Sequence, residues 1–180
     1  MSYAIPTRPS PFSNNQGGPL VGRILVTPLG NPWSYYLHFD TGDIVQLESS
    51  GHCRCGRSSG MILSAVAGRR VNLTLTTDGR IVTLLELDNA LSALEGVREY
   101  QLIQPASGEY NLLLAGDRLY KTGLNQNAPA VLKSVYGKNA LVNIIYTEDI
   151  VPETSGKYLA AKALFPIELE RFLARSENGM

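Results

Sequence analysis

The chain is poor in cysteine and histidine, with two of each among its 180 residues. Two cysteines in the spacing Cys53-x-Cys55 are a poor basis for a disulfide framework and fit a reducing compartment better. Residues 1–6 have neither the charged region nor the apolar region of a signal peptide. These features predict a cytoplasmic protein.

An excess of charge of either sign is also missing, because 16 basic residues balance 16 acidic residues. The chain therefore has no overall field that would attract nucleic acid or an anionic membrane. No apolar run approaches the ~20 residues that a membrane span needs. The remaining composition, 44% hydrophobic and 18% charged, is typical of a globular protein with a sizeable core. We expect neither a nucleic-acid partner nor a membrane.

Composition divides the chain into three parts. Residues 1–21 contain several prolines and few apolar anchors, which predicts an irregular lead-in. Residues 22–67 consist of short β-prone runs broken by Gly, Asn and Pro, and this pattern predicts a small β-rich module. Residues 68–180 combine helical and strand patterns with short connections. They predict a compact α+β sandwich domain, in which helices cover one face of a short sheet.

The expected elements of the third part follow from periodicity. A leucine stripe at helical spacing predicts a helix ending at Gly96. Two β-prone runs flank Pro105-Ala106-Ser107-Gly108, which indicates an antiparallel pair of strands. The expected helices cover residues 84–94 and 128–136, and the expected strands cover residues 71–76, 80–83, 99–104, 109–115 and 141–146.

The tripeptide Thr41-Gly42-Asp43 lies between two β-prone segments. Gly42 allows the backbone to turn and a ligand to approach, while Asp43 presents two acceptor oxygens. A carboxylate held in this way suits a vicinal diol, such as the 2′ and 3′ hydroxyls of a ribose. The alternative is an ordinary turn, for which the same tripeptide is also typical.

Cys53 and Cys55 lie in the glycine-flanked run Gly51–Arg57. Thiolates are good zinc ligands, so the pair is a candidate zinc half-site. Structural zinc needs four ligands, and with only two histidines in the chain, His38 or an outside ligand would have to complete the set. The alternative is a hairpin tip in which the cysteines are incidental.

Gly68, Arg69, Arg70 and Val71 follow the β-rich part and lack strong periodicity. A glycine before two arginines is a natural hinge, because Gly68 absorbs dihedral changes and the arginines can reach an anion or a carboxylate. A solvated linker is the alternative interpretation.

Lys157 ends the loop Pro152-Glu153-Thr154-Ser155-Gly156-Lys157. Its ammonium is a compact point charge suited to a phosphate or to a carboxylate that becomes an acyl phosphate. The run is not a Walker-type phosphate loop, because the glycine-rich half of that pattern is missing. Alone, Gly-Lys in a loop is also typical of a solvated turn.

Together, the three motifs in this order resemble the C-terminal part of the adenylate-forming enzymes, the acyl-CoA synthetases and their relatives. Cys53-x-Cys55-Gly56-Arg57 and the run from Asp78-Gly79-Arg80 through Gly96 to Gln101 are similar to the phenylacetate–CoA ligase and coenzyme F390 synthetase branch. The resemblance covers about residues 20–160.

The resemblance implies an enzyme in which a carboxylate attacks the α-phosphate of ATP to give an acyl adenylate and pyrophosphate, after which a thiol, usually that of coenzyme A, takes the acyl group. It implies that Asp43, within Thr41-Gly42-Asp43, holds the ribose hydroxyls, and that Arg69 lies near the same ribose and phosphate. It makes Lys157 the catalytic lysine that bridges the substrate carboxylate and the α-phosphate. The link Gly68, Arg70 and Val71 would be the hinge of a mobile domain.

Two departures accompany the resemblance. Val71 and Asn72 stand where the family usually has aspartates, and His38-Phe39-Asp40 lacks the usual basic residue. The family's phosphate loop and acyl pocket lie in a large N-terminal region that residues 1–20 do not resemble. We therefore expect ATP or AMP, CoA and a small carboxylic acid only in a full-length enzyme, with the adenylation domain in cis or as a partner chain. By itself the chain would be inactive and hold no tightly bound cofactor. The alternative is a stand-alone, non-catalytic module that docks on a partner, whereas a zinc-ribbon nucleic-acid module disagrees with the neutral charge.

Overall fold

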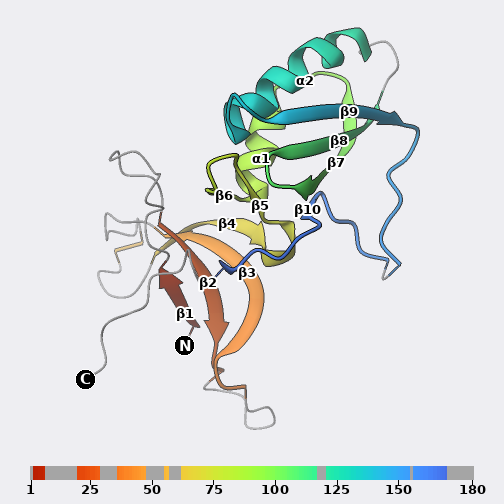
Figure 1. Ribbon diagram of the computed structural model, residues 1–180. Coiled ribbons are helices and arrows are strands. Elements are labelled where there is room, and N and C mark those ends of the chain that lie inside the picture. Colours follow the sequence, from red (N-terminus) through yellow and green to blue (C-terminus); the bar gives the residue numbers. More distant parts are fainter. Residues whose placement is uncertain are drawn as a thin grey trace. The chain divides into compact units, whose positions relative to one another are not determined.

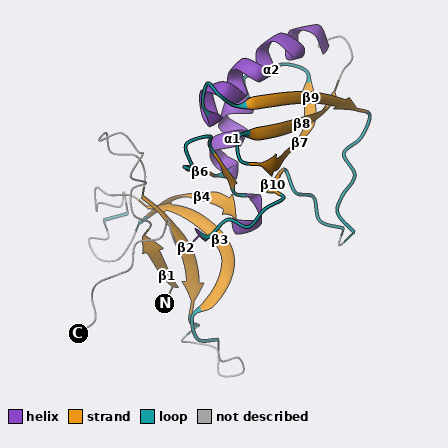
Figure 2. Cartoon of the chain, viewed as in Figure 1, coloured by secondary structure: helices purple, strands orange, loops and turns teal. Residues whose placement is uncertain are grey.

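The computed structural model describes residues 2–6, 20–28, 36–47, 55–56, 62–116, 121–154 and 156–169. The chain divides into two compact units, one built on Met1–Arg70 and the other on Val71–Ile167. Strands dominate both, as Figures 1 and 2 show. In chain order the elements are β1 (Ser2–Pro6), β2 (Leu20–Val26), β3 (Phe39–Leu47), β4 (Leu63–Arg69), the 3-10 helix η1 (Arg70–Asn72), β5 (Thr74–Leu75), β6 (Ile81–Val82), α1 (Leu84–Leu91), β7 (Val97–Ala106), β8 (Glu109–Gly116), α2 (Lys121–Tyr136), β9 (Leu141–Thr147) and β10 (Ala161–Ala163).

The first unit contains a four-stranded sheet in the order β1-β2-β3-β4, and every neighbouring pair is antiparallel. Ile44 and Val45 of β3 and Ala67 of β4 are buried. The register between β3 and β4 shifts between Ile44 and Val45. Such a bulge changes the direction of neighbouring side chains, which accounts for two consecutive buried residues in one strand.

The lead-in expected at residues 1–21 is wrong at its start, because Ser2–Pro6 forms β1 and pairs with Val26–Gly22 of β2. The prolines of this segment indicated irregular chain. β1 is an edge strand, however, and Pro6 is its last residue, where a missing N–H costs no ladder hydrogen bond. Residues 7–19 lie outside the described residues.

The boundary between the units falls after Arg70 instead of after the expected Ala67. Gly68 and Arg69 are part of β4, where they pair with Ile44 and Asp43 of β3. Pairing across the sheet therefore extends the first unit by the very residues that the sequence indicated as a link.

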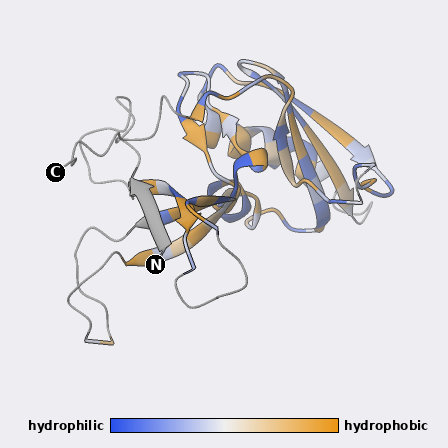
Figure 3. Cartoon of the chain, turned by 90° about the horizontal axis from the view of Figure 1, so that it is seen from below, coloured by the Kyte–Doolittle hydropathy of each residue, from blue (hydrophilic) through white to orange (hydrophobic). Residues whose placement is uncertain are grey.

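The second unit is built on a sheet in the order β10-β7-β8-β9. β7 and β8 form the expected antiparallel pair, while β9 pairs parallel to β8 and β10 pairs parallel to β7. α2 connects β8 to β9, as a crossover between parallel strands requires. The predicted α+β fold class is confirmed, and Figure 3 shows hydrophobic and hydrophilic residues interleaved along these strands.

Both helices pack on one face of this sheet. Tyr110, Leu112 and Leu114 alternate along β8 and belong to the same buried cluster as Leu87 and Leu91 of α1. Each turn of α2 adds a residue to this cluster, at positions four apart along the helix. The α2 members are Leu124, Ala128, Leu132 and Tyr136.

Some elements differ from the sequence expectation. Val71 and Asn72, which were expected in a strand, belong to η1, and α1 ends at Leu91 instead of continuing to Leu94. α2 begins at Lys121, well before the expected Ala128, because Leu124 packs into the core although polar residues surround it in the sequence. β10 was not expected at all. None of the helices in the described part of the chain combines the length and the apolar character that a membrane span requires.

Candidate functional site

Thr41-Gly42-Asp43 lies inside a strand and not in a turn between two strands. Ile44 pairs with Arg23 and Asp40 pairs with Leu25, so residues 41–43 of β3 face only Ile24 of β2. This bulge requires a positive φ, which is +75° at Gly42. Two local hydrogen bonds fix its shape: the Gly42 N–H donates to Asp40 Oδ1 (2.8 Å) and the Asp43 N–H donates to Thr41 Oγ1 (3.2 Å).

Asp43 and Arg69 are brought together across two neighbouring strands. They are register partners on β3 and β4, and Arg69 Nε lies 3.5 Å from Asp43 Oδ1. The two side chains are 63% (Arg69) and 31% (Asp43) exposed. An exposed pair of this kind contributes little to stability, about 0–1 kcal/mol, so it remains available to a ligand.

Asp40 organises the same region and was not singled out by the sequence. Its Oδ2 lies 3.6 Å from Arg23 Nη1 and 4.0 Å from Arg70 Nη1, while its Oδ1 accepts the Gly42 N–H. One carboxylate therefore ties the bulge to β2 and to the last residue of the first unit. Its position two residues before the glycine, which is typical of an Asx turn, is the signal that could have identified it.

Lys157 lies in the second unit, where it closes a short loop together with Glu153. The Glu153 N–H donates to Lys157 O (2.9 Å) and the Gly156 N–H donates to Glu153 O (2.7 Å), with φ of +73° at Gly156. The Lys157 side chain is exposed. Lys162 Nζ donates to Glu153 Oε1 from β10, an ion pair that the sequence did not indicate.

The segment after Lys157 is attached to β7 by three hydrogen bonds. Tyr158 donates its hydroxyl to Tyr100 O, Gln101 Nε2 donates to Leu159 O (2.8 Å), and the Leu102 N–H donates to Ala160 O (2.8 Å). Burial, followed by the nearby Glu99 charge, raises the pKa of Tyr158. The phenol therefore stays protonated as a donor, and the loop has a fixed base.

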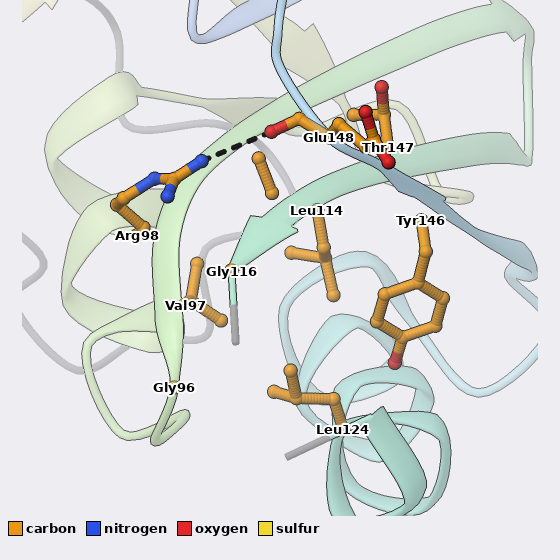
Figure 4. A pocket seen from close by; sticks show the side chains of 10 residues that line it. Gly96, Val97, Arg98, Leu114, Gly116, Leu124, Tyr146, Thr147 and Glu148 are labelled. Carbon is orange, nitrogen blue, oxygen red and sulfur yellow. Dashed lines mark hydrogen bonds between the residues drawn. The ribbon is translucent and has the colours of Figure 1, made fainter. Parts of the chain in front are cut away.

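A cavity of about 460 Å³ opens at one end of the second sheet. Figure 4 shows apolar side chains of β7, β8 and α2 below a polar rim, where Arg98 Nη2 donates to Glu148 O (3.0 Å). The Asp149 carboxylate lies 3.8 Å from the same guanidinium and offsets its charge. Sequence patterns gave no indication of this cavity. Its lining consists of Gly96, Val97, Arg98, Leu114, Ala115, Gly116, Leu124, Tyr146, Thr147 and Glu148.

The candidate residues therefore form two groups. Thr41, Gly42, Asp43 and Arg69 form one group in the first unit, together with Gly68 and Arg70 of the expected hinge. Lys157 belongs to the second unit, and so does Val71, its first residue.

The structure describes only one cysteine of the expected zinc half-site. Cys55 is exposed, and Cys53 lies outside the described residues. No group of three or more His, Cys, Asp or Glu side chains that could hold a metal occurs in the described part of the chain.

The chain matches one family model and is similar to several solved structures. The family model described as the CapK C-terminal domain matches residues 74–163. No curated protein sequence matches the chain.

Among solved structures, the chain is similar to 2-hydroxyisobutyryl-CoA ligase in the postadenylation state in complex with R3-HIB-AMP (16% identity, TM-score 0.61, covering 94% of this chain and 37% of that one). It is also similar to the anthranilate CoA ligase AuaEII in complex with anthranoyl-AMP (13% identity, TM-score 0.54, covering 88% of this chain and 32% of that one). A third similar structure is the A domain of carboxylic acid reductase from Segniliparus rugosus in complex with AMP and a co-purified carboxylic acid (13% identity, TM-score 0.52, covering 84% of this chain and 26% of that one). The chain spans at most 37% of the length of these proteins, and the likeness shows that it has the fold of their C-terminal part.

Proposed function

Since the chain belongs to the CapK C-terminal domain family, we propose that it is the C-terminal part of an ATP-dependent ligase that joins a carboxylic acid to coenzyme A or another thiol. The large adenylation domain, with its phosphate loop and acyl pocket, would be supplied in cis or by a partner chain. On this proposal the protein acts on a small carboxylic acid, and the chain alone is inactive.

One observation carries the proposal: Asp43 and Arg69, distant in sequence, are register partners on β3 and β4. The bulge at Gly42 presents Asp43 with its backbone fixed by Thr41. A carboxylate in this position accepts hydrogen bonds from two vicinal hydroxyls, and a neighbouring guanidinium attracts a phosphate. This combination suits the ribose and phosphate of AMP, ATP or an acyl adenylate.

Lys157 supplies the second element of the proposal. Its side chain is exposed, and its backbone is fixed by the hydrogen bond that closes the loop between Glu153 and Lys157. A positioned charge of this kind stabilises the negative charge that develops when the acid attacks the α-phosphate. We assign to Lys157 the role of bridging the substrate carboxylate and that phosphate.

The link between the units supports a hinge at Gly68, Arg70 and Val71. The boundary between the units falls between Arg70 and Val71, and Gly68 has a φ of +117°. A hinge needs a few residues that absorb dihedral changes at the end of an element. Gly68 lies near the end of β4, and Arg70 and Val71 follow that strand directly. Rotation about this link would separate adenylation from transfer to the thiol.

The phenylacetate–CoA ligase branch is the finer assignment that we propose, on the residues Cys53-x-Cys55-Gly56-Arg57 and Asp78-Gly79-Arg80. Coenzyme A is then the acceptor, and the cytoplasm is the compartment where ATP and coenzyme A are both available.

The test is ATP–pyrophosphate exchange by the chain together with its adenylation domain. Lys157→Ala is expected to lower the exchange rate by about a hundredfold or more, because one positioned charge at the reacting centre is lost. Lys138→Ala is the matched control, since Lys138 is also an exposed lysine, in the turn between α2 and β9. Normal exchange by the Lys157→Ala variant would show that the assigned role is wrong.

A second candidate function is a non-catalytic module that docks on a separate protein. It is favoured by Val71 and Asn72, which replace the aspartates usual in the resembling family, and Val71 is 56% exposed. A stable complex that shows no exchange activity, with Lys157 intact, would support this candidate against the ligase.

A further inference from the structure

The loop that carries Lys157 also contains a carboxylate that can compete for its ammonium. The Glu153 N–H donates to Lys157 O (2.9 Å), so these two residues face each other across the loop. Because their backbones are joined at this point, the long side chains of Glu153 and Lys157 can reach each other and form an ion pair. Such a pair would hold the ammonium away from an anionic substrate.

The Glu153 carboxylate is instead occupied by Lys162. Lys162 Nζ donates to Glu153 Oε1, and the two side chains are only 24% and 36% exposed. Lys157, by contrast, has no ion-pair partner within the part of the chain that the structure describes. The glutamate of the loop therefore pairs with Lys162 of β10 and not with Lys157, which lies in the same loop.

The position of Lys162 is fixed by the sheet. Lys162 is the central residue of β10 and pairs with Ile103 of β7. On either side of it, the Leu102 N–H donates to Ala160 O (2.8 Å) and the Leu164 N–H donates to Gln104 O (2.9 Å). Strand pairing therefore fixes the position from which Lys162 reaches Glu153, whereas Lys157 lies in the loop between β9 and β10.

We propose that Lys162 is a positioning residue: by neutralising Glu153 it leaves the ammonium of Lys157 available to an anionic substrate. The inference rests on the proposed function for the identity of that substrate, a carboxylate next to a phosphate. The charge arrangement itself does not depend on the proposed function. Removing Lys162 frees the Glu153 carboxylate to capture Lys157, and removing Glu153 as well eliminates the competitor.

A purely structural role makes a different prediction. If the Glu153–Lys162 pair only braces the loop, Glu153→Gln, Lys162→Met and the double variant all lose the same brace and behave alike. If Lys162 shields Lys157 from Glu153, Lys162→Met is the most damaging of the three and the double variant recovers.

The first test treats the chain with a zero-length carbodiimide, which joins a carboxylate to a neighbouring amine, and identifies the cross-linked peptides by mass spectrometry. In the wild-type chain Glu153 is expected to be linked to Lys162. In Lys162→Met the yield of the Glu153–Lys157 link is expected to rise about two- to fivefold, the range typical of an exposed ion pair. Lys157→Arg/Lys162→Met is the control that removes this product. A yield of the Glu153–Lys157 link that does not change between wild type and Lys162→Met overturns the proposal.

The second test is ATP–pyrophosphate exchange with the adenylation domain present. The turnover rate is expected to fall about two- to fivefold in Lys162→Met and to recover in the double variant. The expected cross-links, combined with exchange that even Lys157→Ala leaves normal, would support the charge arrangement and contradict the proposed function. The two conclusions can therefore fail separately.

Discussion

Gly42→Ala tests whether the bulge in β3 depends on a left-handed backbone. The native φ is +75°, and a Cβ added at Gly42 would meet no heavy atom within 4 Å. Steric contact with neighbours therefore contributes nothing, and the cost is that of alanine in the left-handed region, about 1–2 kcal/mol. The lower entropy of alanine in the unfolded chain offsets about 0.4–1 kcal/mol of this. The expected net loss is about 1 kcal/mol.

Hydrogen exchange is the suitable assay, because the chain has two units that need not unfold together. The buried residues Ile44 and Val45 report on the first unit, and Leu112 reports on the second. For Gly42→Ala, we expect exchange of the Ile44 and Val45 amides to accelerate about fivefold, which corresponds to about 1 kcal/mol. The Leu112 amide should not change.

Two further variants serve as controls for Gly42→Ala. Gly42→Asn should cost less, because asparagine tolerates the left-handed region better than alanine. Gly79→Ala has the same geometry in the second unit, with a φ of +84° and no atom within 4 Å of the added Cβ, so it should accelerate Leu112 and leave Ile44 unchanged. Unchanged exchange at Ile44 and Val45 in Gly42→Ala would refute the strain argument, and so would equal losses for Ala and Asn.

Two other predictions concern the core of the second unit. Thr74 Oγ1 and the Tyr136 hydroxyl are buried and hydrogen-bonded to each other at 2.8 Å, so Tyr136→Phe or Thr74→Val alone should cost about 1–3 kcal/mol by leaving one hydroxyl unpaired. The double variant should be less destabilised than the two single losses added together, and additive losses in urea unfolding would contradict this coupling. Burial, with a smaller contribution from Asp78, raises the pKa of Tyr110 to about 12. The pKa of Tyr110 is higher in the folded chain than in the unfolded chain, so the folded chain holds the phenol proton more tightly. The free energy of unfolding therefore keeps its full value below pH 10 and falls by up to about 3 kcal/mol between pH 10 and 12. Tyr110→Phe should therefore reduce the fall in unfolding free energy between pH 9 and 11.5, and an unchanged slope would contradict the assignment.

Local patterns predicted the elements in which the spacing of apolar residues follows the period of the helix or strand that they form. The stripe of Leu84, Leu87 and Leu91 gave α1, which Thr83 caps by accepting the Glu86 N–H. The start of α2 could not be predicted, because only Leu124 marks its buried face in a polar stretch. β10 is three residues long with a central lysine, and it exists because β7 offers a free edge to pair with.

The sequence indicated only those candidate residues that lie in short motifs. Thr41-Gly42-Asp43, Arg69 and Lys157 were identified by their order in the chain. Thr41-Gly42-Asp43 was expected in a turn, whereas it forms a bulge because β2 continues opposite it. The ion pairs of Asp40 and of Glu153 depend on strand register, which no local pattern specifies.

The parallel pairing of β10 gives the Lys157 loop a late place in the order of assembly. Gln101 and Leu159, which hold the base of the loop, are separated by 58 residues, while β7 and β8 meet through a short connection. Contacts between distant residues pay a larger entropy of closure and form only after the intervening chain is made. During synthesis, the helices and the strands β7, β8 and β9 of the second unit can assemble before residues 161–163 emerge. A chain truncated after Lys157 would keep most of the buried cluster but lose the hydrogen bonds that hold the Lys157 loop on β7, so a folded core does not by itself show that the site is intact.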